Sequence, residues 1–278
     1  MLTDTLHHVV HRPPVRDWDA VSAGADAIFA TIDALPLPPA GTRRHLRELW
    51  TYRLRAADVE ALLADARPVR LSIHGMHTPD LGFLAAQPQL DALAIDWNNK
   101  LRALEALAAL TGLTVLSLQD LRHVRDLSPL ARLTGLRGLN VSGGIDTKFA
   151  MDTLDPLAGL PQLEELMLAS VRIGDGRLDA LAALPALKRL EIANNAASFE
   201  EFARLAARRP DIACDKLRPY VQLDGTPPPG VDPAVALDMI GDARVMVVGK
   251  HGPFLRARAD RDRLLRYCER FEALKAAA

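Results

Sequence analysis

The sequence predicts an α/β solenoid. A curved parallel sheet would form its concave side, short helices or 3₁₀ segments its convex side, and helical caps would close both ends. The first observation is the segment from Leu113 to Val141, in which leucines at 113, 116 and 118 give the strand pattern L-x-x-L-x-L. The second is repetition, because the same frame begins again every 22 to 27 residues. The frames start at Leu46, Pro68, Leu90, Leu113, Leu136, Leu163, Leu187 and, in degraded form, Arg209.

One repeat of this length cannot fold alone. Ordering about 22 residues costs roughly 1 to 2 kcal/mol of backbone entropy for each residue. The roughly seven leucines buried by a repeat return only about 1.5 to 3 kcal/mol each. Neighbouring repeats must therefore stack, so that they share a parallel strand ladder and one apolar interior. This explains the leucines as core residues and leaves them without a functional role.

The repeat resembles that of leucine-rich repeat proteins, and most closely the internalin-like type with the pattern L-x-x-L-x-L-x-x-N-x-I-x-D. The resemblance covers roughly Leu46 to Leu217 and implies a rigid binding scaffold. The repeat that starts at Leu163 fits the pattern best, at Leu166, Leu168, Ile173 and Asp175.

The turn asparagine of that pattern is present only at Asn98 and Asn195. A continuous asparagine ladder is therefore not expected, and we expect apolar packing to hold the other turns. Those turns carry Leu54, Met76, Leu121, Gly144, Val171 and Leu217 at the same position.

The composition indicates the cellular compartment of the protein and excludes some classes of partner. The formal net charge of −1 gives no field that would demand nucleic acid or an acidic membrane surface. Cys214 and Cys268 form no metal-type cluster and indicate a reducing compartment. The start of the chain lacks a secretory signal, and no apolar span approaches the ~18 residues of a membrane helix. We therefore expect a bacterial-type cytoplasmic protein, with export by a route that needs no such signal as the alternative. Internalins proper are exported, so their adhesive role is not carried over.

The pattern divides the chain into three regions. Residues 1–41 are expected to form a loose arm and a capping helix from Asp17 to Leu35. Residues 42–223 form the solenoid of about eight repeats. Residues 224–278 form a C-terminal cap, with a short strand from Arg244 to Val248 and a closing helix from Asp260 to Ala277. Both caps are needed because the terminal turns of a solenoid expose core.

Positions 3, 5 and 7 of each repeat point away from the leucines, because side chains alternate along a strand. Stacking turns these positions into columns on the concave face. Opposite charges then become lateral neighbours at Glu48 with Arg70, and along Glu165, Arg189 and Asp211. Exposed pairs of this kind contribute only about 0 to 1 kcal/mol each. They therefore support the register more than the stability.

The same columns supply the candidates for partner binding. Aromatic side chains at Trp50, Tyr52, His74 and Trp97 gather in the first three repeats, and such rings are frequent interface anchors. An equally supported alternative to partner contact is that the N-terminal helix covers the side chains of Trp50 and Tyr52. The polar candidates beside these rings are Asp96, Gln119, Asp120 and Asn140.

An insertion, GGIDTKFAMDT, lengthens the fifth repeat. Insertions in repeat arrays fall in loops on one face, often the binding face. Lys148, Phe149 and Met151 are therefore further contact candidates. The alternative for Phe149 is that its ring packs back onto the core.

The sequence gives less support to a catalytic function than to a binding function. Ser72, His74 and Asp96 share one face, but Ser72 and His74 lie about 6 to 7 Å apart along one strand. No glycine-rich turn offers oxyanion donors beside them. The segment around Lys250 follows a strand as a phosphate loop does, yet it has Arg244 in place of the first glycine and His251 in place of the hydroxyl.

The predicted function is a non-catalytic protein-protein recognition module that binds a partner on its concave face, without metal or cofactor. The sequence does not name the partner. An inhibitor of a toxin or enzyme is a narrower version of this function, and an enzyme or nucleotide binder that uses Lys250 is the alternative. Nucleic-acid binding is not expected, because acidic residues interleave with the arginines of the closing helix.

Overall fold

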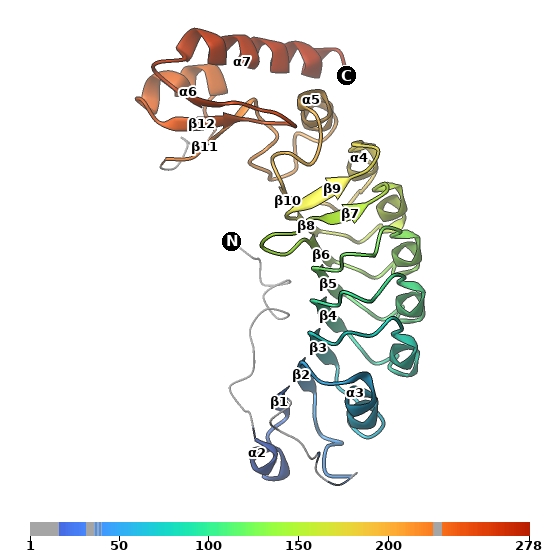
Figure 1. The fold of residues 1–278 in the computed structure, drawn as a ribbon. Coiled ribbons are helices and arrows are strands. Elements are labelled where there is room, and N and C mark those ends of the chain that lie inside the picture. The colour runs from blue at the N-terminus through green and yellow to red at the C-terminus, as the bar shows by residue number, and fades with distance from the viewer. Residues whose placement is uncertain (1–16, 32–36, 38, 40, 225–229) are drawn as a thin grey trace.

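The computed structural model describes residues 17–31, 37, 39, 41–224 and 230–278. Its body is a curved stack of turns, with one parallel sheet along the concave side (Figure 1). This confirms the predicted α/β solenoid. The strands follow one another in chain order as β1 (Ala27–Thr31), β2 (Glu48–Tyr52), β3 (Arg70–His74), β4 (Ala92–Asp96), β5 (Val115–Gln119), β6 (Gly138–Ser142), β8 (Glu165–Leu168) and β10 (Arg189–Ile192).

Short helices and 3₁₀ segments return the chain along the convex side (Figure 1). The leucines of the strands and of these return segments share one continuous core, and Leu116, Leu118 and Leu130 are each 0% exposed. Each turn therefore buries its apolar face against the next turn. The return segments are α3 (Ala56–Leu63), η2 (Gly82–Ala86), η3 (Glu105–Ala109), η4 (Ser128–Arg132), η5 (Asp155–Gly159), α4 (Asp179–Ala182) and α5 (Phe199–Arg208).

The lateral charge pairs confirm the predicted register. Glu48 lies opposite Arg70, and Glu165 lies opposite Arg189. Arg70 Nη2 is 2.7 Å from Glu48 Oε2, and Arg189 Nε is 3.7 Å from Glu165 Oε1. The seven frames from Leu46 to Leu187 each contribute a strand in the expected order.

The eighth frame was placed two residues too early. Ala213, and not Asp211, lies opposite Arg189, and the two form a single isolated bridge. The guanidinium of Arg209 binds Asp211 at 2.8 Å and also donates to the Leu187 carbonyl at 2.8 Å. Asp211 is therefore paired within its own turn, and the sheet ends at β10.

The predicted N-terminal helix from Asp17 to Leu35 is wrong beyond its first turns. Asp17 does cap a helix, since its carboxylate accepts from the Ala20 N–H at 2.8 Å, but α2 (Trp18–Ser22) ends there. The chain then enters β1, where Ile28 and Ala30 are 0% exposed and pair with β2. The sheet therefore begins one strand before the first predicted frame. The predicted arm, residues 1–16, and the end of the predicted helix, residues 32–35, lie outside the described residues.

The insertion in the fifth repeat adds a second, small sheet. After β6 the chain forms the loop of residues 143–148 and then β7 (Phe149–Met151), which pairs in parallel with β9 (Val171–Ile173). Phe149 and Met151 are each 1% exposed. The extra residues therefore extend the core as well as the surface.

A left-handed residue follows most strands of the sheet. Its backbone N–H donates to the carbonyl that ends the next strand, for example from Arg53 to His74 at 2.8 Å and from Trp97 to Gln119 at 3.0 Å. This bond continues the ladder by one residue before each chain turns outward. The residues with positive φ at this position are Arg53, Gly75, Trp97, Asp120 and Ser170.

A three-stranded antiparallel sheet and two helices form the C-terminal cap (Figure 1). Phe271 of the last helix packs edge-on against Phe199 of α5, with ring centroids 5.3 Å apart. The N–H groups of Gly249 and Lys250 donate to the carbonyls of Asn194 and Ala197 at 3.0 and 2.8 Å. The cap therefore docks on the last turn through both apolar and backbone contacts. Its elements are β11 (Tyr220–Gln222), α6 (Pro233–Met239), β12 (Arg244–Val247), β13 (Phe254–Arg256) and α7 (Arg261–Ala276).

None of the helices in the described part of the chain has the length and hydrophobicity needed to cross a bilayer.

The cap makes the thiol of Cys268 inert. Burial within α7 raises the pKa of Cys268 to about 12, far above the ordinary thiol value of about 8.5. We expect iodoacetamide to leave Cys268 unmodified in the native protein at mildly alkaline pH and to modify it in urea, as peptide mass mapping would show. Because the unfolded chain releases this proton first, stability should also decline as the pH rises above about 8.5. Rapid native modification of Cys268 would contradict this packing.

Candidate binding surface

Five rings form a continuous cluster at the ends of β1 to β4. We call these rings the aromatic cluster: Phe29, Tyr52, His74, His77 and Trp97. Tyr52 stacks on His74 with centroids 4.8 Å apart and planes at 14°, and Phe29 lies 6.2 Å from Tyr52 on the other side. Trp97 lies 5.7 Å from His74 and 5.4 Å from His77. Tyr52, His74 and Trp97 are half-buried and His77 is exposed, so the cluster is packed on one side and accessible on the other.

The backbone holds Trp97 in an unusual conformation. Its φ is +55°, a left-handed value that is rare for a bulky residue and costs about 1 to 2 kcal/mol. Gly75 makes room for the ring, because a Cβ there would lie 3.1 Å from Arg53 Cγ and 3.3 Å from Trp97 Cε3. The Arg53 guanidinium lies 5.6 Å from the Trp97 ring centroid, within cation–π range. Arg53 and His77 thus belong to the same surface as Tyr52, His74 and Trp97, although the sequence did not identify these two residues as contact candidates.

His74 is fixed by a carboxylate. Its Nδ1 lies 2.5 Å from Asp96 Oδ2, because the two residues are paired neighbours on β3 and β4. Both side chains are half-buried. The bond orients the imidazole plane that stacks against Tyr52, and it leaves Asp96 at the edge of the aromatic cluster.

Two predicted contact residues are buried instead. Trp50 is 7% exposed, lies between Phe29 and Ser72 across the sheet, and donates from Nε1 to Glu48 at 2.7 Å. Its neighbour is β1, and not the helix proposed to cover it. Asn140 is also 7% exposed, and its amide bonds to Ser117 at 2.9 Å and to Ser142. The polar groups of both side chains form hydrogen bonds within the sheet, so these two residues are not available to a partner.

Small side chains make the middle of the concave face flat. Ala92, Ala94 and Val115 pack together with Met167 in a cluster separate from the leucine core. Gly138 continues this strip on β6. Ala92, Ala94 and Val115 are only 2%, 5% and 6% exposed, whereas Gln119 at the end of β5 is exposed beside them.

Residues 143–148, which we call the rim loop, are tied to the end of the neighbouring strand. Thr147 Oγ1 donates to Asp120 at 2.5 Å, so Asp120 holds the loop and is only half-buried. A Cβ on Gly143 would lie 2.2 Å from the Thr147 carbonyl, so only glycine permits this closure. The loop therefore has a defined shape.

The structure corrects the prediction for Phe149 and Met151, which directly follow the rim loop and are each 1% exposed. Phe149, a predicted contact, is 1% exposed and packs in the core through β7, so the alternative reading of that ring is the correct one. Ile145 is 102% exposed at the loop tip, and Lys148 is exposed near it. The sequence reading missed Ile145, and the glycine pair before it was the available signal for a projecting tip.

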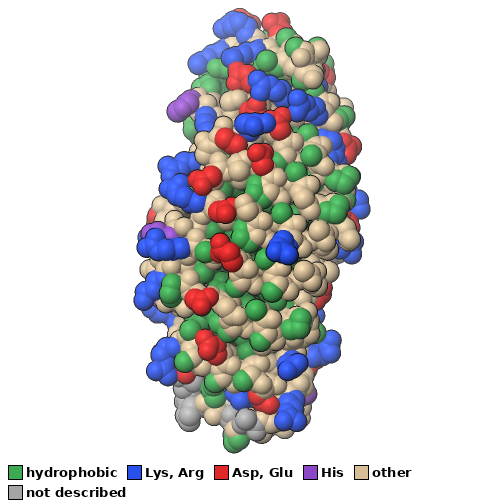
Figure 2. All heavy atoms as spheres, turned by 90° about the vertical axis from the view of Figure 1, so that its right-hand side faces the viewer, with side chains coloured by type: hydrophobic (Ala, Val, Ile, Leu, Met, Phe, Trp, Pro, Cys, Tyr) green, Lys and Arg blue, Asp and Glu red, His purple; other side chains and the backbone are tan. Residues whose placement is uncertain are grey.

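The convex side is mixed in charge. Figure 2 looks onto this side and shows acidic side chains in a row down its length, with Lys and Arg side chains at the margins. Ion pairs also connect neighbouring turns, since Glu164 pairs with Arg137 and Lys188 at 2.6 and 2.8 Å. These pairings lower the pKa of the Glu164 carboxyl, chiefly through hydrogen bonds from Lys188 and Arg137.

The segment around Lys250 does not form a phosphate cradle. Phosphate loops need free backbone N–H groups, but those of Gly249 and Lys250 are bound to Asn194 and Ala197, and that of Gly252 donates to Gly249 at 3.0 Å. The segment instead docks the cap. These three amides are therefore not free to bind a phosphate group, and they give no support to the nucleotide-binding alternative.

No protein-family model matches the chain, and no curated protein matches it. Among solved structures, internalin C2 of Listeria monocytogenes is 22% identical over 59% of this chain and 66% of its own, with a TM-score of 0.46. A second internalin of that species, inlF, is 18% identical over 67% of this chain and 64% of its own, at 0.43. A leucine-rich repeat protein of Leptospira interrogans is 16% identical over 62% of this chain and 55% of its own, at 0.46. The chain thus spans less than two thirds of each.

The fold is identified from the arrangement of the strands, the core and the helical segments. Seven strands lie 22 to 27 residues apart in the sequence and side by side in one parallel sheet, above a leucine core that every turn shares. Short helical segments complete each turn on the opposite side. The chain has the leucine-rich repeat fold.

Proposed function

We propose that the protein is a non-catalytic recognition module for another protein, which contacts the aromatic cluster and the rim loop. The observation that carries this proposal is the half-exposed, rigidly held aromatic cluster around Trp97. Large rings whose conformation is already fixed lose little entropy on binding, so they serve well as anchors. The strain at Trp97 also suggests a function, because nothing in the repeat pattern requires a tryptophan there.

The remaining features fit an extended partner surface. Ile145 offers an apolar contact on the rim loop. Asp96 and Gln119 supply hydrogen-bonding groups beside the rings. A central group of aromatic anchors with polar groups at its edge is the usual anatomy of a protein interface.

The cysteines support a reducing compartment. Cys214 and Cys268 are both free, and burial raises the pKa of each thiol. Neither is needed to hold the fold together by a disulfide. We therefore propose that the module acts in the cytoplasm.

The test is affinity purification from the native cell, comparing the wild-type chain with Trp97→Ala and Ile145→Asp. We expect Trp97→Ala to weaken binding of the partner by about 2 kcal/mol or more, roughly thirtyfold, because it removes the central anchor. Ile145→Asp should weaken it by about tenfold, since a charge replaces an apolar contact. Titration of the recovered partner against each variant would give these ratios.

Phe254→Ala is the matched control, because Phe254 is a 71% exposed aromatic residue on the cap, outside the concave face. It should retain every partner at wild-type affinity. Thermal unfolding would verify that the variants keep the fold. If the double variant of Trp97 and Ile145 folds and still recovers the same proteins as the wild type, the proposed surface is wrong.

A further inference from the structure

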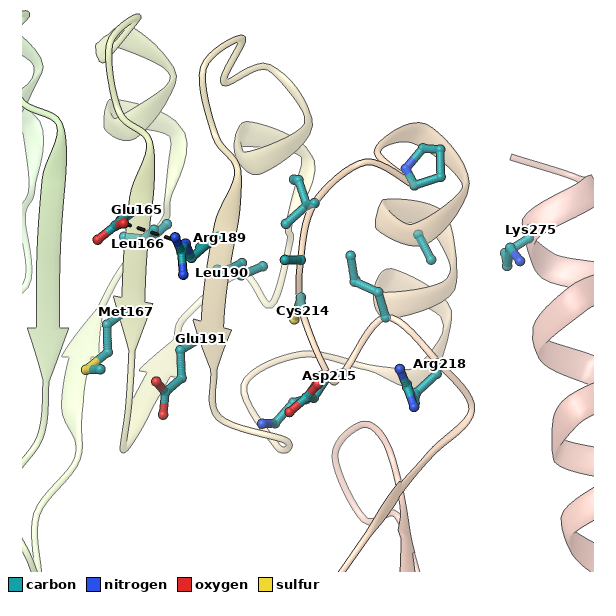
Figure 3. Close-up of a pocket in the computed structure, with 16 residues that line it drawn as sticks. Glu165, Leu166, Met167, Arg189, Leu190, Glu191, Cys214, Asp215, Arg218 and Lys275 are labelled. Atoms are coloured by element: carbon teal, nitrogen blue, oxygen red, sulfur yellow. Dashed lines mark ion pairs between the residues drawn. The ribbon is translucent and has the colours of Figure 1, made fainter. Parts of the chain in front are cut away.

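A cleft opens where the sheet ends. It has a volume of about 830 Å³ and lies between β8, β10, the segment of residues 210–218 and the end of α7 (Figure 3). Ala213 forms one bridge with Arg189, and the chain then turns, with the Leu217 N–H donating to the Cys214 carbonyl at 3.3 Å. No further strand therefore continues the sheet in this part of the described chain. The volume falls within the range of about 300 to 1,000 Å³ that is typical of ligand sites.

The walls of the cleft carry opposite charges. Glu191 lies on the strand side and Arg218 on the side nearer α7, with Asp215 between them (Figure 3). Within the described residues, neither Glu191 nor Arg218 forms an ion pair with another side chain, whereas Lys275 across the cleft is bound to Glu272 at 2.8 Å. Lys216 adds a second cation two residues before Arg218. The cleft thus presents a cationic and an anionic subsite at once.

Arg218 is suited to hold a carboxylate. Arg218 is half-buried, and within the described residues no carboxylate forms an ion pair with its guanidinium. A guanidinium binds a carboxylate through two parallel hydrogen bonds, which gives both affinity and orientation. Burial raises the pKa of the Cys214 thiol on the cleft floor. This thiol therefore stays neutral and adds no negative charge that would repel an anion.

We propose that this cleft binds a ligand with a free carboxylate and a cationic side chain, namely the C-terminal arginine or lysine of a peptide, or the free basic amino acid. The carboxylate binds Arg218 and Lys216, and the cation lies between Glu191 and Asp215. Leu217, which is half-buried and lines the cleft, contacts the aliphatic part of the ligand. This site shares no residue with the aromatic cluster and does not depend on its function.

Calorimetric titration of the full chain tests the proposal with three probes: acetyl-Gly-Gly-Arg as the free acid, the same peptide as its C-terminal amide, and free arginine. The free acid should bind, and the amide should bind about tenfold more weakly or worse, because it loses a charged hydrogen-bond acceptor. Arg218→Gln should weaken binding of the free acid by a similar factor, and Lys216→Gln and Glu191→Gln by smaller ones. Tighter binding of the peptide than of free arginine would assign the site to a chain terminus, and the reverse order to the amino acid.

Arg258→Gln is the matched control, since Arg258 is an exposed cap arginine that does not line the cleft. It should leave the affinity unchanged. Trp97→Ala should also leave it unchanged, which separates this site from the proposed partner surface. The proposal is overturned if the amide binds as well as the free acid, if folded Arg218→Gln and Lys216→Gln variants keep wild-type affinity, or if no probe binds at millimolar concentration.

Discussion

Gly249→Ala should detach the C-terminal cap and lower the free energy of unfolding by at least about 3 kcal/mol. Gly249 has a φ of +95°, and a Cβ there would lie 2.5 Å from Phe199 N and 2.9 Å from Phe199 Cα. Both atoms belong to the backbone at the start of α5, so neither can move aside cheaply. The displaced segment would lose the bonds from Gly249 to Asn194 and from Lys250 to Ala197. Urea unfolding measures the loss, and hydrogen exchange of the α5 amides would locate it.

Gly241→Ala is the control for this change. Gly241 also lies in the cap and has a φ of +62°, but an added Cβ would meet nothing within 4 Å. Only the left-handed conformation is then penalised, at about 1 kcal/mol after the gain in the unfolded state is subtracted. Equal losses for the two variants would show that backbone conformation, and not contact with Phe199, makes the glycine necessary.

The stacking could be predicted because leucine spacing fixes both the period and the inward face. Once Leu46 to Leu187 are aligned, the lateral neighbours Glu48 with Arg70 and His74 with Asp96 follow from alternation alone. The two ends of the sheet could not be predicted in this way. Short apolar runs are ambiguous between helix and strand, and Ile28 and Phe29 satisfied a helical face equally well. Pairing with β2, which is a tertiary contact, decides for the strand.

The binding surface was only partly predictable for a related reason. Alternation identifies which side chains leave the core, but it does not say how much of each remains exposed. Trp50 and Asn140 point to the concave side and are still buried, because lateral neighbours and their own hydrogen bonds enclose them. The insertion after β6 interrupts the alternation, so the pattern does not indicate that Phe149 is buried or that Ile145 is exposed.

The turns that follow the strands also differ in how far the sequence predicts them: most are held by apolar packing, and one depends on specific hydrogen bonds. Leu54, Met76, Leu121 and Val171 are each at most 3% exposed, which confirms that apolar packing holds those turns. Asn98 works differently. It is 1% exposed, donates to the Thr78 carbonyl at 2.9 Å, and accepts from the N–H groups of Lys100 and Leu101 at 3.1 Å each.

Asn98→Leu should therefore lower the free energy of unfolding by about 2 to 4 kcal/mol, although leucine occupies this position in neighbouring repeats. The turn after β4 contains Trp97, and the backbone groups of this turn are positioned to form hydrogen bonds with the Asn98 amide. Leucine would leave the Thr78 carbonyl and two N–H groups without partners, at about 1 to 3 kcal/mol for each one that water cannot reach. Urea denaturation of the purified variant gives the value.

Asn195→Leu is the matched control, because Asn195 occupies the same position of its own repeat but is exposed. Its substitution should change stability by no more than about 0.5 kcal/mol. The contrast would show that the asparagine of the repeat pattern matters only where the turn is closed over it. If Asn98→Leu were as stable as the wild type, apolar packing alone would suffice at every turn, and the three hydrogen bonds of Asn98 would contribute nothing to holding Trp97 and the aromatic cluster in place.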